Sequence, residues 1–459
     1  MFPLPLSSME KFHLAADSAD FPNTIFCRMR FSGEIDETIA RDATKRMLKR
    51  HLLILKTIGG AGQWELSADD SEETLDAKLE RMLTWTYCDG QDPVNEDSFA
   101  PKLQTEFDNA VVPQVDINAE HGLRAWVYVG SGHTMILTGI HHAAGDGGGG
   151  IQLLSDFFQV YDNLCSDRDW DHGLRRLDIS LLKERGRIGL FTKNYLRHLW
   201  KQPIALLGMA KFMLRKFRVF EPNKKTLTPT TNFPGILGCW LNESDSANIQ
   251  SFADDQNVRV NSVAMAAVFN ACQKWLDRGD DAETTGWIRM LLPISYRAKS
   301  DLRLPVTNKA TIVQVDRCKK QMHNGKTFLH YLNREIDIVV GWQFDKIFLM
   351  VIGLLAKLPG RLKRSADDPS ARGTIVFTNL GEPFRLKKVV KRNWSGQLQW
   401  IDFDFVGPIR PAMPVNFTLQ RHQERYRLSL HFDRRVLTEE SATEFLASIA
   451  DELKGLQQS

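Results

Sequence analysis

The stretch HTMILTGIHHAAGDGGGGIQLLSDFF, residues 133–158, carries the signals that decide the fold of this 459-residue chain. An apolar run leads directly into His141 and His142, and Asp146 with four glycines follows them. The next segment has its large apolar side chains at helical spacing, so we predict a strand, a loop and a helix in this order. The two histidines therefore lie where a strand ends and a loop begins.

Residue types alone leave four interpretations of this loop open. Neighbouring strand residues point to opposite faces, so His141 and His142 are poorly placed to ligate one metal ion. Glycines before a helix favour anion binding, but the lysine of a nucleotide-binding loop is absent. A histidine at a strand end can act as a general base, because its pKa lies near neutrality. Two histidines without a chemical role are the fourth interpretation.

Length, charge and cysteine content limit the possible number of domains, the partners and the compartment. A length of 459 residues exceeds a single core, and we predict two domains, residues 1–220 and 221–459. The net charge of +3 gives no argument for binding nucleic acid. Six scattered cysteines without a CxxC pair favour a reducing compartment, and the N-terminus lacks the pattern of a secretory signal. We therefore expect a cytoplasmic monomer.

Patterns along the rest of the chain mix strands and helices in both halves. Strands are predicted at residues 23–32, 133–140, 309–316, 373–381 and 427–433, and from 287 to an end at Pro293. Helices are predicted at residues 34–53, 151–164, 261–276 and 438–456. The prolines of residues 221–235 indicate an interdomain linker. The longest apolar run, residues 347–358, is too short to span a bilayer.

Residues 181–225 combine many lysines and arginines with apolar side chains, and we predict a pair of basic amphipathic helices divided at Pro203. Two interpretations stand side by side. The helices pack on the core with a solvated basic face, or they form a docking face. The docking partners that fit a basic face are anionic lipid, an acidic acyl carrier protein and the phosphates of coenzyme A.

A resemblance to a known family adds to this reading. The segment HHAAGDG, residues 141–147, matches the HHxxxDG motif of the chloramphenicol acetyltransferase-like superfamily. That superfamily includes nonribosomal-peptide condensation domains, plant acyltransferases, alcohol acetyltransferases and bacterial wax ester synthases. Further segments resemble it in the same order, namely residues 26–56, 260–276, 291–311, 377–381 and 425–446.

The resemblance implies an α/β fold of two acetyltransferase-like domains, each a mixed sheet flanked by helices, with a channel between them. It implies that His142 is the general base and His141 a packing residue. Asp146 is expected to pair with Arg297, and Gly147 to allow a tight turn before the helix. Thr378 and Asn379 are expected either to donate hydrogen bonds to an oxyanion or only to shape the channel.

The activity that the resemblance implies is acyl transfer from a thioester to an alcohol or an amine. We predict a coenzyme A-dependent O-acyltransferase that requires no metal and no tightly bound cofactor. One alternative is a condensation-type enzyme that takes its donor from a carrier protein in trans. The other is a non-catalytic binding protein with the same fold. A peripheral membrane contact through residues 181–225 is compatible with each.

Two segments depart from the family pattern. Residues 402–408, DFDFVGP, only partly match the DFGWG element of plant members, and we interpret them as a structural loop. Gly148, Gly149 and Gly150 stand where the family often has Ser or Thr. We expect them to loosen the start of the helix or to open room for a pantetheine arm or an acyl chain.

Overall fold

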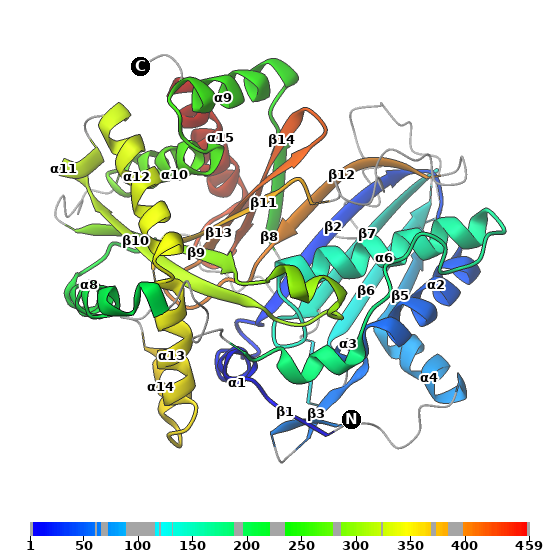
Figure 1. The fold of residues 1–459 in the computed structure, drawn as a ribbon. Coiled ribbons are helices and arrows are strands. Elements are labelled where there is room, and N and C mark those ends of the chain that lie inside the picture. The colour runs from blue at the N-terminus through cyan, green and yellow to red at the C-terminus, as the bar shows by residue number, and fades with distance from the viewer. Residues whose placement is uncertain are drawn as a thin grey trace.

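The computed structural model describes residues 3–59, 62–65, 72–88, 115–118, 121–130, 132–187, 196–220, 235–278, 286–322, 325–368, 373–383 and 398–456. Their strands form two large mixed sheets and one small sheet, and helices flank the large sheets (Figure 1). The α/β architecture predicted from the sequence is confirmed. The predicted linker lies almost wholly outside the described residues.

The first large sheet has five strands in the order β12-β2-β7-β6-β5. Their bounds are Gln399–Val406, Thr24–Ser32, His133–His141, Leu123–Gly130 and Leu83–Tyr87. Three helices lie against it, namely α2 at Glu37–Arg50, α4 at Glu72–Met82 and α6 at Gly147–Cys165. The strand, loop and helix predicted around the two histidines are therefore β7, residues 142–146 and α6.

The second large sheet has six strands in the order β10-β9-β11-β13-β14-β8. Their bounds are Ala310–Cys318, Trp287–Ser295, Ile375–Gly381, Val415–His422, Arg425–Phe432 and Gly235–Trp240. It packs on α9 at Glu243–Asp255, α10 at Val260–Leu276 and α15 at Glu439–Gly455.

β9 continues past Pro293, contrary to the prediction. Its other neighbour, β11, pairs only at Met290 and Leu291, so a missing amide at Pro293 costs little there.

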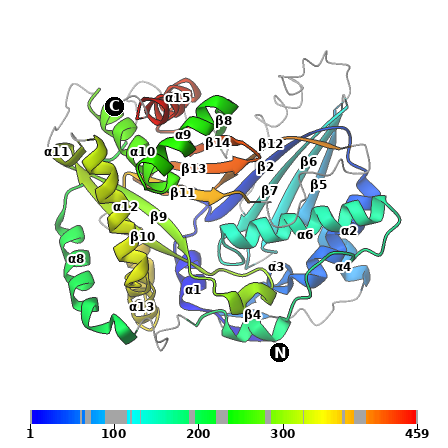
Figure 2. The ribbon, with the colours of Figure 1, turned by 45° about the horizontal axis from the view of Figure 1, so that its top comes forward.

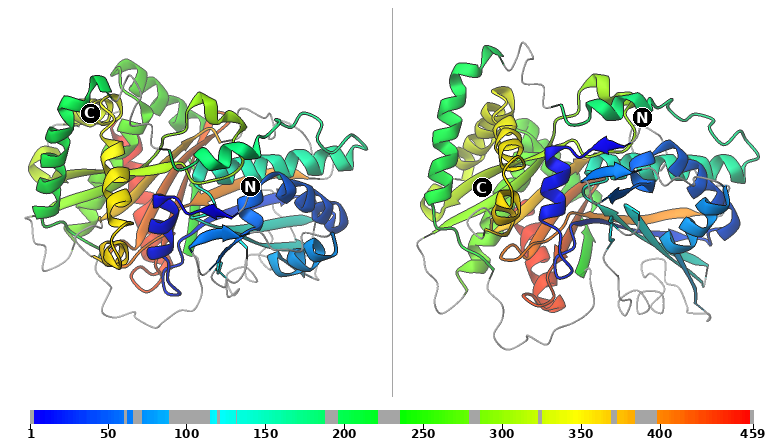
Figure 3. Two further views of the ribbon diagram at one scale, coloured as in Figure 1. Left: turned by 60° about the horizontal axis from the view of Figure 1, so that its bottom comes forward. Right: turned by 90° about the horizontal axis from the view of Figure 1, so that it is seen from below.

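Smaller elements complete the fold. A small sheet joins β1 at Leu4–Pro5, β4 at Gln63–Glu65 and β3 at Thr57–Gly59. The short helices are α1 at Ser8–Ala15, α3 at Leu52–Leu55 and α11 at Lys319–Met322, with 3-10 turns at Ile179–Glu184, Leu199–Lys201 and Lys299–Arg303. The helices α12 at Gly325–Gly341, α13 at Asp345–Leu355 and α14 at Arg361–Asp367 were not predicted. α1 contacts both α13 and α14 (Figure 3).

The segment that we interpreted as a loop at residues 402–408 is mostly strand, which corrects that prediction. Residues 402–406 belong to β12, which pairs with β2 although most of the second half of the chain builds the other large sheet (Figure 2). The alternation of aspartate and phenylalanine fits a strand with two different faces. Asp402 and Asp404 face buried arginines, and Phe403 and Phe405 join the apolar core.

The basic segment is described only in part. The helix α8, Gln202–Leu214, contains Pro203 in its first turn, where the missing amide has no partner to lose. The predicted division of two helices at Pro203 stays a prediction. The first predicted helix falls largely on residues 188–195, outside the described residues. The part of α8 that faces solvent is not basic alone, because several of its large apolar side chains are exposed.

Among the described residues, no single helix is both long and apolar enough to cross a bilayer. By length and composition alone, α12 and α13 pass that test as a pair, bent by 54° at their break.

Candidate active site

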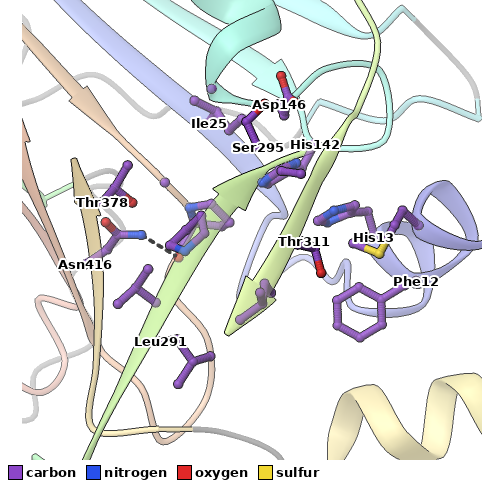
Figure 4. A pocket seen from close by; sticks show the side chains of 18 of the residues that line it. Phe12, His13, Ile25, His142, Asp146, Leu291, Ser295, Thr311, Thr378 and Asn416 are labelled. Carbon is purple, nitrogen blue, oxygen red and sulfur yellow. Dashed lines mark hydrogen bonds between the residues drawn. The ribbon is translucent and has the colours of Figure 1, made fainter. Parts of the chain in front are cut away.

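A cavity of about 220 Å³ lies where the two large sheets approach each other. Its lining comes from β9, β10 and β11 of one sheet, from the β7–α6 loop of the other, and from α1, α13 and α14. More than half of the lining side chains are apolar, and His142 lies among the polar ones (Figure 4). A largely apolar pocket with a few convergent polar groups is typical of a small-molecule site.

His142 is the first residue after β7. Its backbone is hydrogen-bonded to two residues that are distant from each other in the sequence. Its amide donates to the Asn23 carbonyl oxygen at 2.8 Å, and its own carbonyl accepts from Asn308 Nδ2 at 2.8 Å. The Asn308 side chain is oriented at its other end, because Oδ1 accepts from the Ala310 amide at 3.1 Å. The imidazole is therefore fixed at the cavity wall while its ring stays half-buried.

The environment of His142 favours the neutral ring. Burial lowers its pKa to about 4, and nearby Arg410 and His141 act in the same direction. A hydrogen bond between the ring and its own carbonyl group, together with the charge of Asp146, opposes this shift. That bond requires the proton on Nδ1, which leaves Nε2 free to accept a proton. In the other tautomer, Nδ1 accepts from Asn308 Nδ2, which lies 2.9 Å away.

A third histidine, which the sequence reasoning missed, stacks on His142. The ring centroids of His13 and His142 are 3.9 Å apart, and the ring planes differ by 10°. Asn23 holds His13 in place, because its Nδ2 donates to the His13 carbonyl oxygen at 2.7 Å and lies 3.1 Å from Nδ1. Burial and the neighbouring His142 lower the pKa of His13 well below its usual value. No local pattern in α1 distinguishes His13, so only the fold brings it here.

The structure brings Asp146 and Arg297 together, although they are 151 residues apart. Asp146 Oδ1 lies 2.6 Å from Arg297 Nη2 and also accepts from the Gly149 amide at 2.7 Å, which caps α6. Its Oδ2 accepts from the Lys309 amide at 2.7 Å. Arg297 donates in addition to the Thr307 carbonyl oxygen at 2.7 Å. Asp146 thus joins the start of α6 to the segment that carries Asn308.

His141 is fully buried, on the face of β7 opposite to the cavity. Its Nδ1 accepts from the Ala143 amide at 3.1 Å, and its Nε2 lies 3.5 Å from Asp17 Oδ2. Within the described parts of the chain, no group of three His, Cys, Asp or Glu side chains is placed to hold a metal ion. The histidines and Asp146 have separate partners.

Gly147 to Gly150 form the first turn of α6, and Gly147 and Gly148 line the cavity. Gly147 has no positive φ, so a left-handed turn does not require it. An added Cβ at Gly150 would lie 3.2 Å from the Phe405 ring, and one at Gly148 would lie 3.3 Å from Arg297 Nε. The side chain of Asp146 caps this turn, and the expectation that the glycines loosen it stays a prediction. They let β12 and Arg297 approach closely.

Thr378 and Asn379 lie on β11 and line the cavity. Asn379 Oδ1 accepts from the Gly381 amide at 2.8 Å, so its amide nitrogen faces away from that turn. Asn416 is a further polar group that the sequence reasoning missed. Its Nδ2 donates weakly to the Pro408 carbonyl oxygen at 3.4 Å, and its buried Oδ1 has no hydrogen-bond partner among the residues that the structure describes. Arg410 lies 5.1 Å above the Phe12 ring and completes the polar set.

Comparison by sequence finds no matching family model and no matching curated protein. The fold, however, is similar to solved structures over nearly the whole chain. The first condensation domain of the CDA synthetase has a TM-score of 0.68 at 12% identity, covering 99% of this chain and 96% of that one. The epimerization domain from the third module of tyrocidine synthetase B has a TM-score of 0.65 at 12% identity, with coverages of 99% and 97%. A third match is TRI3 trichothecene 15-O-acetyltransferase from Fusarium sporotrichioides, at 0.63 and 13%, with coverages of 98% and 94%.

These matches confirm the predicted resemblance at the level of fold. The chain shares its fold with condensation domains and with an O-acetyltransferase. Identities this low show the fold alone.

Proposed function

We propose that this protein is an acyltransferase that moves an acyl group from a thioester to an alcohol or an amine, with His142 as the general base. The observation that carries the proposal is the position of the His142 ring. It lies in the cavity wall, its backbone is held by Asn23 and Asn308, and its neutral form dominates near pH 7. A neutral imidazole is able to take a proton from an acceptor at that pH.

The proposed reaction balances without a further reactant. With the proton of the neutral ring on Nδ1, Nε2 of His142 removes the proton of the acceptor hydroxyl as its oxygen attacks the thioester carbonyl carbon. The resulting tetrahedral intermediate expels the sulfur, and the thiolate takes the proton back from Nε2. The products are an ester and a free thiol. Negative charge that develops beside the ring raises its proton affinity during the first step, which compensates for its low pKa.

The oxyanion of the intermediate requires donors on the opposite side of the reacting carbonyl. Thr378 and the Asn379 amide, which line the cavity from β11, are the groups that we propose for this task. One such donor contributes about 3 kcal/mol to transition-state stabilisation. Asp146 and Arg297 take no part in proton transfer in this scheme, because their contacts are made to each other and to backbone groups.

Acyl-CoA is the donor that we propose, as a substrate and not as a tightly bound cofactor. A donor carried by an acyl carrier protein in trans is the second candidate, since solved condensation domains share this fold. We propose that the enzyme acts as a cytoplasmic monomer.

Substitution of the proposed base tests the mechanism. His142→Ala should lower the rate of free-thiol release from a panel of acyl-CoA donors by about 10²–10⁴, because general-base catalysis is lost. His172→Ala is the matched control, since His172 is an exposed histidine outside the cavity. The melting temperature of both variants should stay within a few degrees of the wild type. Wild-type turnover by a folded His142→Ala protein would refute the mechanism.

The donor is tested separately. The same acyl group should be offered as the coenzyme A thioester and on a holo acyl carrier protein, at equal concentrations. We expect the coenzyme A thioester to support the higher kcat/KM. A clear preference for the carrier thioester would show that the donor is carrier-bound, and His142 would remain the proposed base. Thiol release from neither thioester would refute the proposed activity.

A further inference from the structure

Large apolar side chains crowd one outer surface of the molecule, formed by the 3-10 turn at Leu199–Lys201, by α8 and by the outer side of α13. We call it the α8–α13 surface and define it by Leu199, Trp200, Ile204, Leu207, Leu214 and Leu354. Trp200 is 70% exposed, Leu207 66%, Leu214 87% and Leu354 62%. A cluster of this kind on a water-facing surface marks an interaction site, because isolated exposed side chains are common but clusters are not.

The two helices lie side by side and share polar contacts at one end. α8 contacts α13, and Gln202 Nε2 donates to the Trp342 carbonyl oxygen at 3.1 Å in the turn before α13. Lys201 Nζ lies 3.5 Å from the centre of the Trp342 ring. Figures 2 and 3 show α8 beside α13 from two directions. The two helices that carry the exposed apolar groups are therefore neighbours on the outside of the protein.

Basic residues predominate along this surface. Residues 196–218 contain six Lys or Arg and no Asp or Glu, and residues 346–366 contain five, with Asp345 and Asp367 directly at their ends. Three of these cations, Arg215, Arg218 and Lys363, pair with aspartates. In the chain as a whole, 59 basic and 56 acidic residues nearly balance, so this separation is local. Lys357, Arg361 and Arg364 are exposed just beyond the apolar part of α13. A cationic surface of this kind is complementary to an anionic partner.

The composition of the two helices favours a lipid partner over a protein one. α8 has one charged residue in thirteen, and α13 is apolar after its first turn. A helix that is apolar on nearly all sides is stable when buried in a core or in lipid, yet these two are exposed on one side. An exposed Trp and leucines beside lysines and arginines are the pattern of a helix that lies in a membrane interface. An acidic carrier protein needs the charges but not the apolar groups.

We propose that the α8–α13 surface docks on an anionic lipid bilayer. α13 then has two roles, because its inner side forms part of the cavity wall. Phe348 and Ile352 line the cavity, while Leu354 on the same helix faces outward. Docking places the cavity one helix away from the lipid, so a lipophilic acceptor or acyl donor reaches it from the membrane. This inference depends on the surface alone and holds whether or not His142 is a base.

Flotation of the full chain with lipid vesicles tests the proposal. We expect binding to phosphatidylcholine vesicles that contain about 30 mol % phosphatidylserine, and binding at least about tenfold weaker without the anionic lipid. Trp200→Gln/Leu207→Gln should reduce binding about tenfold or more, because it removes two apolar groups from the interface. Lys357→Glu/Arg361→Glu should abolish the preference for phosphatidylserine.

Matched controls make the result specific. Leu302→Gln/Tyr331→Gln removes one leucine and one aromatic residue that are also exposed, 53% and 61%, but lie outside this surface, and it should bind like the wild type. His142→Ala should also bind normally, which separates a failure of the docking proposal from a failure of the proposed catalysis. Equal binding by Trp200→Gln/Leu207→Gln and the wild type overturns the proposal. Binding to a holo acyl carrier protein without binding to vesicles overturns it as well and assigns the surface to a protein.

Discussion

Two buried aspartates, Asp146 and Asp404, each join distant segments of the chain, and they do so in different settings. Asp404 on β12 accepts from Arg28 at 2.7 and 3.1 Å, from Arg427 at 2.9 Å and from Ser429 at 2.8 Å. Both arginine side chains are at least 94% buried. Asp146 has one arginine partner, Arg297, whose side chain is 23% exposed at the cavity.

The Asp404 network stabilises the fold as a whole, whereas the Asp146–Arg297 pair orders only the site. Burial would raise the pKa of Asp404, but the guanidinium groups of Arg427 and Arg28 outweigh it and hold that pKa well below its usual range. This network joins β12 to β2, β14 and, through the Ile236 carbonyl oxygen, β8. Asp146 organises only the start of α6 and the neighbouring segment. We therefore expect changes at Asp404 to act on global stability and changes at Asp146 to act on the site.

The largest effect should come from Asp404→Asn. It removes the carboxylate that two buried arginines share, although Arg427 keeps Asp402 at 3.2 Å. The free energy of unfolding, measured by urea denaturation, should fall by about 3–5 kcal/mol. Glu444→Gln is the control, since its pair with Arg278 is exposed and contributes about 0–1 kcal/mol. A loss at Asp404 no larger than that of the control would show that the network does not hold β12.

No local pattern predicts this network. The sequence DFDF shows a period of two, but β12 pairs with residues of β2 that lie 367 to 380 positions earlier in the chain. Pairing at that distance depends on the register and the packing of the whole sheet, and not on propensity. The local elements around His142 were predictable for the opposite reason. Their hydrophobic periodicity and the capping residue Asp146 lie within one short stretch.

A smaller effect is expected at the second aspartate. Asp146→Asn keeps an acceptor for the Gly149 amide but removes the charge opposite Arg297, and it should cost about 1–3 kcal/mol. Asp146→Ala also removes the cap of α6 and should cost about 1 kcal/mol more. Equal unfolding free energies for Asp146→Asn and the wild type would show that Arg297 turns to solvent without loss.

The pairing of Asp146 with Arg297 followed from family resemblance and not from residue spacing. Residues 291–311 matched a family segment that carries an arginine, and the fold brings this arginine to α6. The stacking of His13 on His142 had no such signal. α1 packs against the site through α13 and α14, which the sequence reasoning did not predict.

Acid should act on the buried histidines and on the Asp404 network in different pH ranges. Burial lowers the pKa values of His142 and His431 to about 4, against 6.5 in the unfolded chain. Between these values the unfolded state binds more protons, so stability falls as the pH drops from 6.5 towards 4. Each such histidine contributes up to about 1.4 kcal/mol per pH unit. The Asp404 network is lost only below the usual pKa of an aspartate, 3.8.

Urea denaturation across this pH range checks the assignment to particular histidines. His142→Ala should reduce the slope of stability against pH between 4 and 6.5 by roughly one proton, because one site no longer titrates. The slope below the usual range of aspartate should not change, since Asp404 is intact. An unchanged slope above pH 4 would mean that His142 is not held neutral by the fold.

The smallest effects should come from two glycines in the first turn of α6. Gly148 lies beside Arg297, and Gly150 lies beside Phe405 of β12. Gly148→Ala brings a methyl group 3.3 Å from Arg297 Nε, a flexible group that is able to shift by a few tenths of an ångström. Gly150→Ala meets Phe405 of β12 at 3.2 Å and Ile140 at 3.4 Å, both deep in the core. Alanine favours a helix over glycine by about 1 kcal/mol, so Gly148→Ala should raise the melting temperature slightly. Gly150→Ala should lower it, because overpacking of a rigid core outweighs that gain. Thermal unfolding that ranks the two variants in the reverse order would mean that the Arg297 side is the rigid one.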